Sequence, residues 1–250
     1  MNERQGPLGA LKLSAKLDLF AAFAEIARGL GNAHRLDLLE HLAQGERSVE
    51  ALAAKAGLTV ANASQHLQAL RRVGLVAGER RGKRVVYRIA GDDVLDLVAA
   101  LRKVGERHTE SVKAVVSDYF HARDELDAVE FMVLEQMLSD GLVTLLDVRP
   151  ADEFADGHVP GAVNIPLAEL KARLDEVPPE TRVVAYCRGP WCVLAFEAVA
   201  LLRKEGRDAR RLDGGLPEWR RAGRRVIPGR ASNPASGPGL RSVRDGARAP

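Results

Sequence analysis

The spacing of apolar residues differs between the two halves of this chain of 250 residues, which indicates two domains of different class. In the first half, apolar residues such as Leu36, Leu39 and Leu42 recur every three or four positions, as in a helix with one buried face. In the second half, continuous apolar runs at 142–148 and 182–187 are typical of buried strands. Helical segments lie between and after these runs, so we expect a parallel α/β sheet there.

The first half has the element order of a helix-turn-helix with a wing. Helices are expected at 15–43, with an interruption at 29–32, and then at 49–55 and 59–73. Strand-like residues follow at 75–77 and 84–89, and Gly78 and Gly82 bracket the turn between them. A mainly helical winged domain is therefore expected.

The helix expected at 59–73 has an apolar face and a polar face. Val60, Ala63 and Leu67 fall on the expected core side. Asn62, Gln65 and His66 fall on another side, and such groups read base edges in the major groove. The segment from Arg71 to Arg88 contains seven basic residues and a single acidic residue, Glu79. The basic residues are Arg71, Arg72, Arg80, Arg81, Lys83, Arg84 and Arg88. This basic cluster suits contact with DNA phosphates. The alternative interpretation is that the helix and the basic turn are simply exposed to solvent and bind no partner.

The sequences LGNAHRLDLL at 30–39 and ANASQHLQALRRVGLV at 61–76 resemble the ArsR-type winged-helix repressors. The resemblance covers about residues 15–120. It implies a homodimer bound to a palindromic operator in double-stranded DNA, with Ser64, Gln65 and His66 facing the bases.

Many members of that family sense metals, but this chain offers poor ligands. Residues 48–57 contain no cysteine, and the thirteen positions between His108 and His121 put them on nearly opposite helix faces. We therefore expect no metal site at Glu106, His108, His121 and Asp124, and no cofactor.

The expected organisation is a flexible N-terminus at 1–14, a winged-helix and dimerisation domain at 15–120, a linker at 121–129, an α/β domain at 130–229 and a disordered tail at 230–250. Within the first domain, one long helical stretch with an apolar face at 92–121 is the expected dimerisation element. The chain has no apolar run of membrane length and no secretory leader, so a cytoplasmic protein without membrane contact is expected.

The only two cysteines, Cys187 and Cys192, lie five positions apart in a Gly-Pro turn between an apolar run and a helix-forming run. A strand, a short loop and a helix start present unpaired backbone N–H groups to an anion. The helix dipole and Arg188 are expected to favour the thiolate of Cys187, which makes it a reactive thiol. Ligands bind at the carboxyl ends of parallel strands, where Cys187 falls.

Residues 127–228 resemble a rhodanese domain through LDVR at 146–149, GHVPGA at 157–162, Cys187 and DGGLPEW at 213–219. The resemblance implies that Cys187 is a nucleophile that takes a sulfane sulfur from a small sulfur species or persulfide donor. Arg149 and Asp147 would support the loop, with Arg149 pairing Glu153. The expected substrate cradle consists of Arg188, Gly189, Pro190, Trp191 and Cys192.

Cys192 stands where rhodaneses with strong thiosulfate activity carry a basic residue. It is either a resolving thiol for a Cys187 persulfide or a small buried apolar residue. Three functions are compatible with the sequence: a repressor whose second domain senses sulfane sulfur, an active sulfurtransferase fused to a DNA-binding domain, and a repressor whose second domain is an interaction module. The first is preferred.

Overall fold

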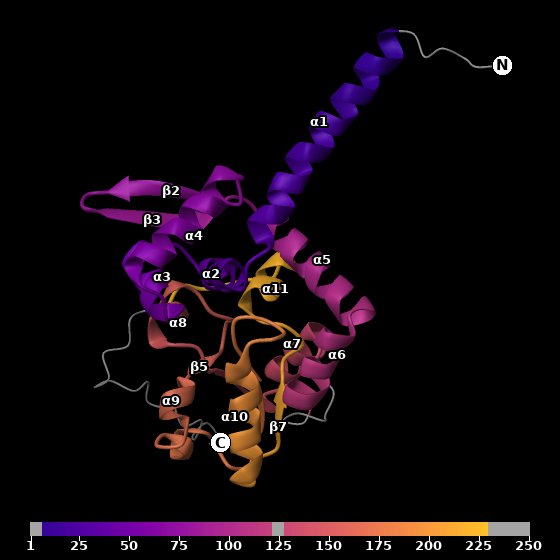
Figure 1. The fold of residues 1–250 in the computed structure, drawn as a ribbon. Coiled ribbons are helices and arrows are strands. Elements are labelled where there is room, and N and C mark those ends of the chain that lie inside the picture. Colours follow the sequence, from indigo (N-terminus) through magenta and orange to yellow (C-terminus); the bar gives the residue numbers. More distant parts are fainter. Residues whose placement is uncertain (1–6, 122–127, 230–250) are drawn as a thin grey trace, which may run out of the picture.

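The computed structural model describes residues 7–121 and 128–229, which form two domains that lie against each other (Figure 1). The expected linker at 121–129 lies mostly outside the described residues, and the expected tail at 230–250 lies outside them. No helix among the described residues is both long enough and apolar enough to cross a membrane.

The N-terminal domain is a winged helix-turn-helix, as predicted. Its elements are α1 (Pro7–Leu30), α2 (Ala33–Ala43), β1 (Arg47–Ser48), α3 (Val49–Lys55), α4 (Val60–Arg72), β2 (Val76–Arg81) and β3 (Arg84–Ile89). The antiparallel sheet has the order β1-β3-β2, and its β2-β3 hairpin is the wing that extends from the body in Figure 1. The side chains of Asn32, Ser48 and Thr59 each accept a hydrogen bond from a first-turn N–H, which fixes the starts of α2, α3 and α4.

One core of apolar side chains joins the helices of this domain. Leu38 from α2, Leu52 from α3 and Leu67 from α4 are completely buried in it. Ala63 is buried as expected, but the prediction for Val60 is wrong because its side chain is 49% exposed. Val60 is the first residue of α4, and the core contacts of this helix begin at Ala63.

Helix α1 begins at Pro7, within the segment 1–14 that was expected to be flexible. It extends away from both domains for most of its length (Figure 1). Its last turns join the core through Ile26 and Leu30, whereas Leu17, Phe20 and Phe23 are at least half exposed. A helix with such an apolar surface gains most of its stability from a packing partner.

The single long helix expected at 92–121 is a wrong prediction. The chain forms α5 (Asp92–His108), α6 (Glu110–Val115) and a π-helical turn, η1 (Val116–His121). Thr109 has extended φ and ψ angles of −116° and 111°, which end α5. At Gly105 a Cβ atom would lie 3.4 Å from the side chain of Val112, so α6 packs back closely on α5 at this point.

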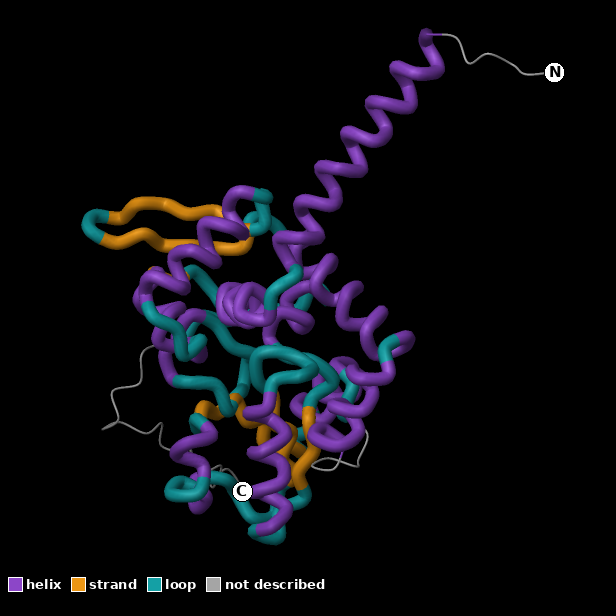
Figure 2. The backbone as a smooth tube through the Cα atoms, in the orientation of Figure 1, coloured by secondary structure: helices purple, strands orange, loops and turns teal. Residues whose placement is uncertain are grey.

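The second domain is α/β with a parallel sheet, as predicted. Its elements are α7 (Phe131–Ser139), β4 (Val143–Asp147), α8 (Ala151–Asp156), β5 (Val163–Asn164), α9 (Leu167–Leu170), the 3-10 turn η2 (Leu174–Glu176), β6 (Arg182–Tyr186), α10 (Val193–Lys204), β7 (Ala209–Arg211) and α11 (Leu216–Arg221). The strand order is β5-β4-β6-β7, with every pairing parallel. Figure 2 shows these strands enclosed by helices, and two apolar clusters fill the two faces of the sheet.

Candidate active site and DNA-binding surface

The loop 187–192 connects β6 to α10 and lies at the carboxyl end of the sheet, as expected. The N–H of Cys192 donates to the carbonyl of Gly189 at 3.1 Å, and the N–H of Leu216 donates to the carbonyl of Cys187 at 3.2 Å. A Cβ atom at Gly215 would lie 2.4 Å from the nitrogen of Gly189 and 2.5 Å from the carbonyl oxygen of Cys187. The absence of a side chain at Gly215 therefore lets the start of α11 press directly on this loop, which we call the sulfur loop.

The thiol of Cys187 is completely buried, and its Sγ lies 3.4 Å from the carbonyl oxygen of Cys192. Burial raises the pKa of Cys187 well above its ordinary value of 9.0, and the neighbouring Cys192 raises it further. Arg188 was expected to favour this thiolate, but its guanidinium binds Glu153 instead, with N–O distances of 2.8 and 2.9 Å. The prediction of a ready thiolate at Cys187 is wrong for this arrangement of the loop.

Cys192 is also buried, and both cysteines are free thiols. A hydrogen bond from the thiol of Cys187 lowers the pKa of Cys192, against the opposing effect of burial. The Cys187 thiol also lies near two main-chain oxygens, the carbonyl of Cys192 at 3.4 Å and that of Gly189 at 3.9 Å. The surroundings of the loop therefore raise the pKa of Cys187 and lower the pKa of Cys192.

Asp147 and Arg149 form a fully buried ion pair below the loop. The Nε of Arg149 lies 3.0 Å from Oδ1 of Asp147, and Nη2 donates to the carbonyl of Gly157 at 2.8 Å. Arg149 was expected to pair with Glu153, and this is a wrong prediction. Asp147 is only two positions from Arg149 at the end of β4 and satisfies its charge locally.

Glu153, on α8, is the acceptor for two cations from different domains. Arg188 of the sulfur loop and Lys55 of α3 both bind Oε1, at 2.8 and 2.9 Å. Burial alone would raise the pKa of Glu153, but the hydrogen bonds from Arg188 and Lys55 hold it at about 2. The carboxylate therefore ties the sulfur loop to the DNA-binding domain.

This carboxylate predicts a pH dependence of stability. Because its pKa falls from an ordinary 4.5 to about 2 on folding, its contribution is present above pH 4.5 and is lost as the pH falls toward 2. The shift corresponds to a contribution on the order of 3 kcal/mol. Urea denaturation of the wild type between pH 2 and pH 6 should show this loss. The variant Glu153→Gln should be less stable at pH 6 and should vary less with pH; parallel profiles for the two proteins would contradict the assignment.

Gln44, the residue that follows α2, makes the second link between the domains. Its Nε2 donates to the carbonyl of Arg188 at 3.2 Å, and its Oε1 accepts from Nη1 of Arg149 at 3.1 Å. A third link is the indole N–H of Trp191, which donates to Glu106 of α5 at 2.7 Å. The sequence gives no sign of the roles of Gln44 and Lys55 or of the contact between Glu106 and the loop, because no local pattern marks residues that act across a domain boundary.

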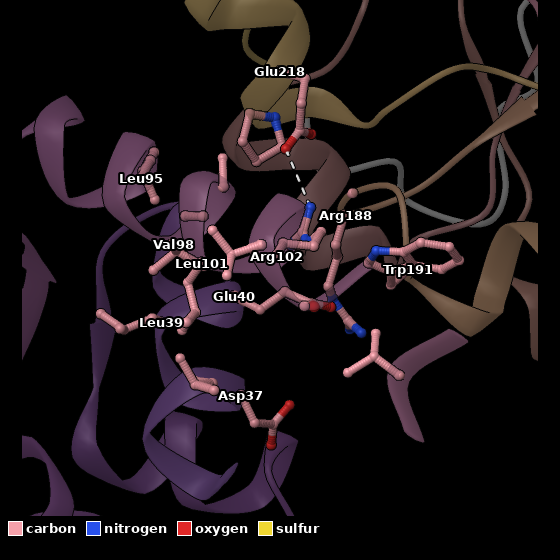
Figure 3. A pocket seen from close by; sticks show the side chains of 18 of the residues that line it. Asp37, Leu39, Glu40, Leu95, Val98, Leu101, Arg102, Arg188, Trp191 and Glu218 are labelled. Atoms are coloured by element: carbon pink, nitrogen blue, oxygen red, sulfur yellow. Dashed lines mark ion pairs between the residues drawn. The ribbon is translucent and has the colours of Figure 1, made fainter. Parts of the chain in front are cut away.

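A cavity of about 890 Å³ lies between the domains (Figure 3). Its walls come from α2, α5, α6, η1 and α11, and the sulfur loop contributes Arg188, Gly189 and Trp191. Glu40 and Arg188 lie close together in this view. Of the expected cradle residues, Pro190 instead faces a neighbouring cavity, and the Cys187 thiol faces neither.

The expected DNA-binding residues lie on α4 and the wing. Asn62 and Gln65 are exposed, and so are the basic residues Arg71, Arg72, Arg80, Arg81, Lys83 and Arg84. Ser64 is half-buried and accepts from Gln68 at 3.1 Å, and the ring of His66 lies 5.6 Å from that of His34. Arg81 pairs with Glu46 and Glu79, so the wing presents fewer free cations than its sequence suggested.

The fold and the site define a winged-helix DNA-binding domain joined to a rhodanese-like domain. A family model of the rhodanese-like domain matches residues 132–222, and one of a helix-turn-helix domain matches residues 30–79. The HTH-type transcriptional regulator Rv0324 of Mycobacterium tuberculosis is 44% identical over 214 residues, which cover 86% of this chain and 94% of that protein. The chain belongs to the same family of HTH-type transcriptional regulators, and it carries a C-terminal rhodanese-like domain.

Each domain also has relatives of its own. A homodimeric winged helix-turn-helix DNA-binding domain, Mb0332 from Mycobacterium bovis, is 40% identical. The match covers 44% of this chain and 95% of that one, with a TM-score of 0.36. A sulfurtransferase from Allochromatium vinosum is 33% identical over 96 residues, which cover 38% of this chain and 88% of that protein.

Proposed function

We propose that this transcriptional regulator is a repressor that senses sulfane sulfur through a persulfide at Cys187. The observation that carries the proposal is the burial of Cys187 in a loop that lies against the DNA-binding domain, where Gln44 binds the loop directly and Lys55 binds it through Glu153. Protein interiors are close-packed, so an extra sulfur atom on a completely buried thiol needs the loop to move. A movement of this loop therefore acts on α2 through Gln44 and on α3 through Glu153 and Lys55, and both helices share one core with α4.

The repressor is proposed to act as a homodimer on a palindromic operator. The unpartnered apolar residues of α1 and the exposed Leu101 and Val104 of α5 support an interface between two copies. The M. bovis relative is described as homodimeric, which agrees with this proposal. Two symmetric α4 helices would then read two half-sites about one helical turn of DNA apart.

In the DNA complex, Asn62, Ser64, Gln65 and His66 are proposed to face bases, and the wing is proposed to bind phosphates. Lys83→Ala and Arg84→Ala should each weaken operator binding and reduce the salt dependence of log K by about 1. Fluorescence anisotropy at several salt concentrations measures both effects. Lys171→Ala, on the exposed surface of the second domain, is the control. An unchanged salt slope in both wing variants would contradict the phosphate assignment.

Sensing is tested by the operator affinity of reduced and polysulfide-treated protein. The wild type should change its Kd by tenfold or more on treatment, and Cys187→Ser should show no change. If Cys192 is the resolving thiol, Cys192→Ser should keep the response while blocking any bridge between the two sulfurs. A wild-type affinity that polysulfide does not alter would overturn the proposal.

An active sulfurtransferase is the second candidate, favoured by the similarity to the A. vinosum sulfurtransferase. Its catalytic group would again be Cys187, in a cradle of Arg188, Gly189, Pro190, Trp191 and Cys192. Steady thiosulfate–cyanide turnover that is lost in Cys187→Ser would favour this function. Burial of the thiol and engagement of Arg188 by Glu153 argue against rapid turnover.

A further inference from the structure

Gln44 bridges the two domains with both ends of its amide. Its side chain belongs to a residue that is only 1% exposed. The Nε2 group donates to the carbonyls of Glu40 and Arg188 at 3.3 and 3.2 Å, and Oε1 accepts from Arg149. Arg188 directly follows Cys187, so this bond fixes the backbone next to the reactive sulfur.

The hydrogen bond from Gln44 to Arg188 also links the loop to α4, the helix expected to contact DNA bases. Gln44 immediately follows α2, and the α2 side chains Leu38, Leu39 and Leu42 belong to the core that holds α4. A buried amide that loses one partner pays the desolvation of the unpaired group. If the loop moves away from Gln44, either the Gln44 amide stays buried without its partner or α2 shifts together with the loop.

The closed loop also controls the access of a sulfur donor to Sγ of Cys187. The residue Cys187 is completely buried, and the adjoining cavity is lined by Arg188, Gly189 and Trp191 rather than by the thiol. A donor in that cavity meets the outer side of the loop. The loop must therefore open before a donor reaches Sγ.

We propose that Gln44 is a positioning residue that holds the sulfur loop closed over Cys187, and that reaction at Cys187 releases this bond and thereby loosens the DNA-binding domain. The second part of this proposal, the effect of the Cys187 reaction on the DNA-binding domain, rests on the proposed sensing function. With a polysulfide donor, the sulfur of Cys187 attacks a terminal sulfur of HSₙ⁻, forming one S–S bond and breaking another. The products are the Cys187 persulfide and HSₙ₋₁⁻, which keeps the electron pair of the broken bond and takes up the thiol proton.

The first test is the rate at which polysulfide modifies Cys187 in the full chain, followed by peptide mass. Gln44→Leu removes all side-chain hydrogen bonds at similar volume, and Gln44→Glu keeps an oxygen for Arg149 but lacks the amide that donates to Arg188. Both variants should react at least tenfold faster than the wild type. Gln136→Leu changes an exposed glutamine on α7 and should react at the wild-type rate. Wild-type rates in both Gln44 variants would overturn the closing role.

The second test is the ratio of operator Kd values after and before polysulfide treatment. The ratio should be tenfold or more in the wild type and close to one in Gln44→Leu, even when mass shows complete persulfidation. If Gln44 has a purely structural role, Gln44→Leu should lower thermal stability but keep the wild-type ratio of Kd values. That outcome would overturn the proposed coupling of Cys187 to the DNA-binding domain through Gln44. A wild-type ratio of one would refute the sensing function, while the reaction rates would still decide the closing role of Gln44.

Discussion

Replacement of Arg149 by leucine should lower the free energy of unfolding by about 3–5 kcal/mol. Arg149 and Asp147 are both completely buried, and the change leaves the Asp147 carboxylate without its cation in the interior. It also removes the donor to the carbonyl of Gly157 and to Gln44, so part of the loss falls on the domain interface. Urea denaturation followed by circular dichroism measures the change.

The matched control is Arg173→Leu. Arg173 pairs with Glu169 and Glu176 at the surface, so its loss should cost less than about 1 kcal/mol. The double replacement of Asp147 and Arg149 by leucine should recover part of the stability lost in the single variant, because no unpaired charge remains buried. Equal losses for Arg149→Leu and Arg173→Leu would contradict the role assigned to the buried pair.

The substitution Gly215→Ala should deform the sulfur loop and destabilise the protein by about 1–3 kcal/mol. The new Cβ would lie 2.4–2.5 Å from backbone atoms of Cys187, Arg188 and Gly189, and these atoms cannot rotate away as a flexible side chain does. The displaced loop should expose Cys187, so we expect faster alkylation of this thiol. Thermal denaturation and peptide mass after iodoacetamide treatment measure the two effects.

Gly189→Ala is the control for Gly215→Ala because it changes a glycine of the same loop. Its Cβ would meet only the Glu218 side chain, at 3.7 Å, which is an ordinary contact. Stability and alkylation should therefore stay close to the wild type. If Gly215→Ala behaved like Gly189→Ala, the close approach of α11 to the sulfur loop would be wrong.

The sequence predicted the elements whose residues carry a local signal. The helices expected at 49–55 and 59–73 correspond to α3 and α4, and the apolar runs at 142–148 and 182–187 correspond to β4 and β6. The short strands β5 and β7 have two and three residues, which is too little for a detectable period. The break at Thr109 escaped prediction because the apolar pattern continues on both sides of it.

The position of the candidate site was predictable, but its electrostatics were not. Cys187 follows a strand and precedes a helix, and local sequence places it at the carboxyl end of the sheet. The state of its thiol depends on burial and on Glu153, which lies 35 positions from Arg188 and draws its guanidinium away. Gln44 and Lys55 act from the other domain, and a pairing across domains has no spacing that sequence analysis can detect.

The central claim is that the sulfur state of Cys187 sets the affinity for DNA. The most direct test titrates one sample with polysulfide and follows persulfide at Cys187 by intact mass and operator binding by anisotropy. We expect the change in operator binding to follow persulfide occupancy in the wild type, and we expect neither quantity to change in Cys187→Ser. Complete persulfidation of Cys187 with unaltered operator binding would contradict it.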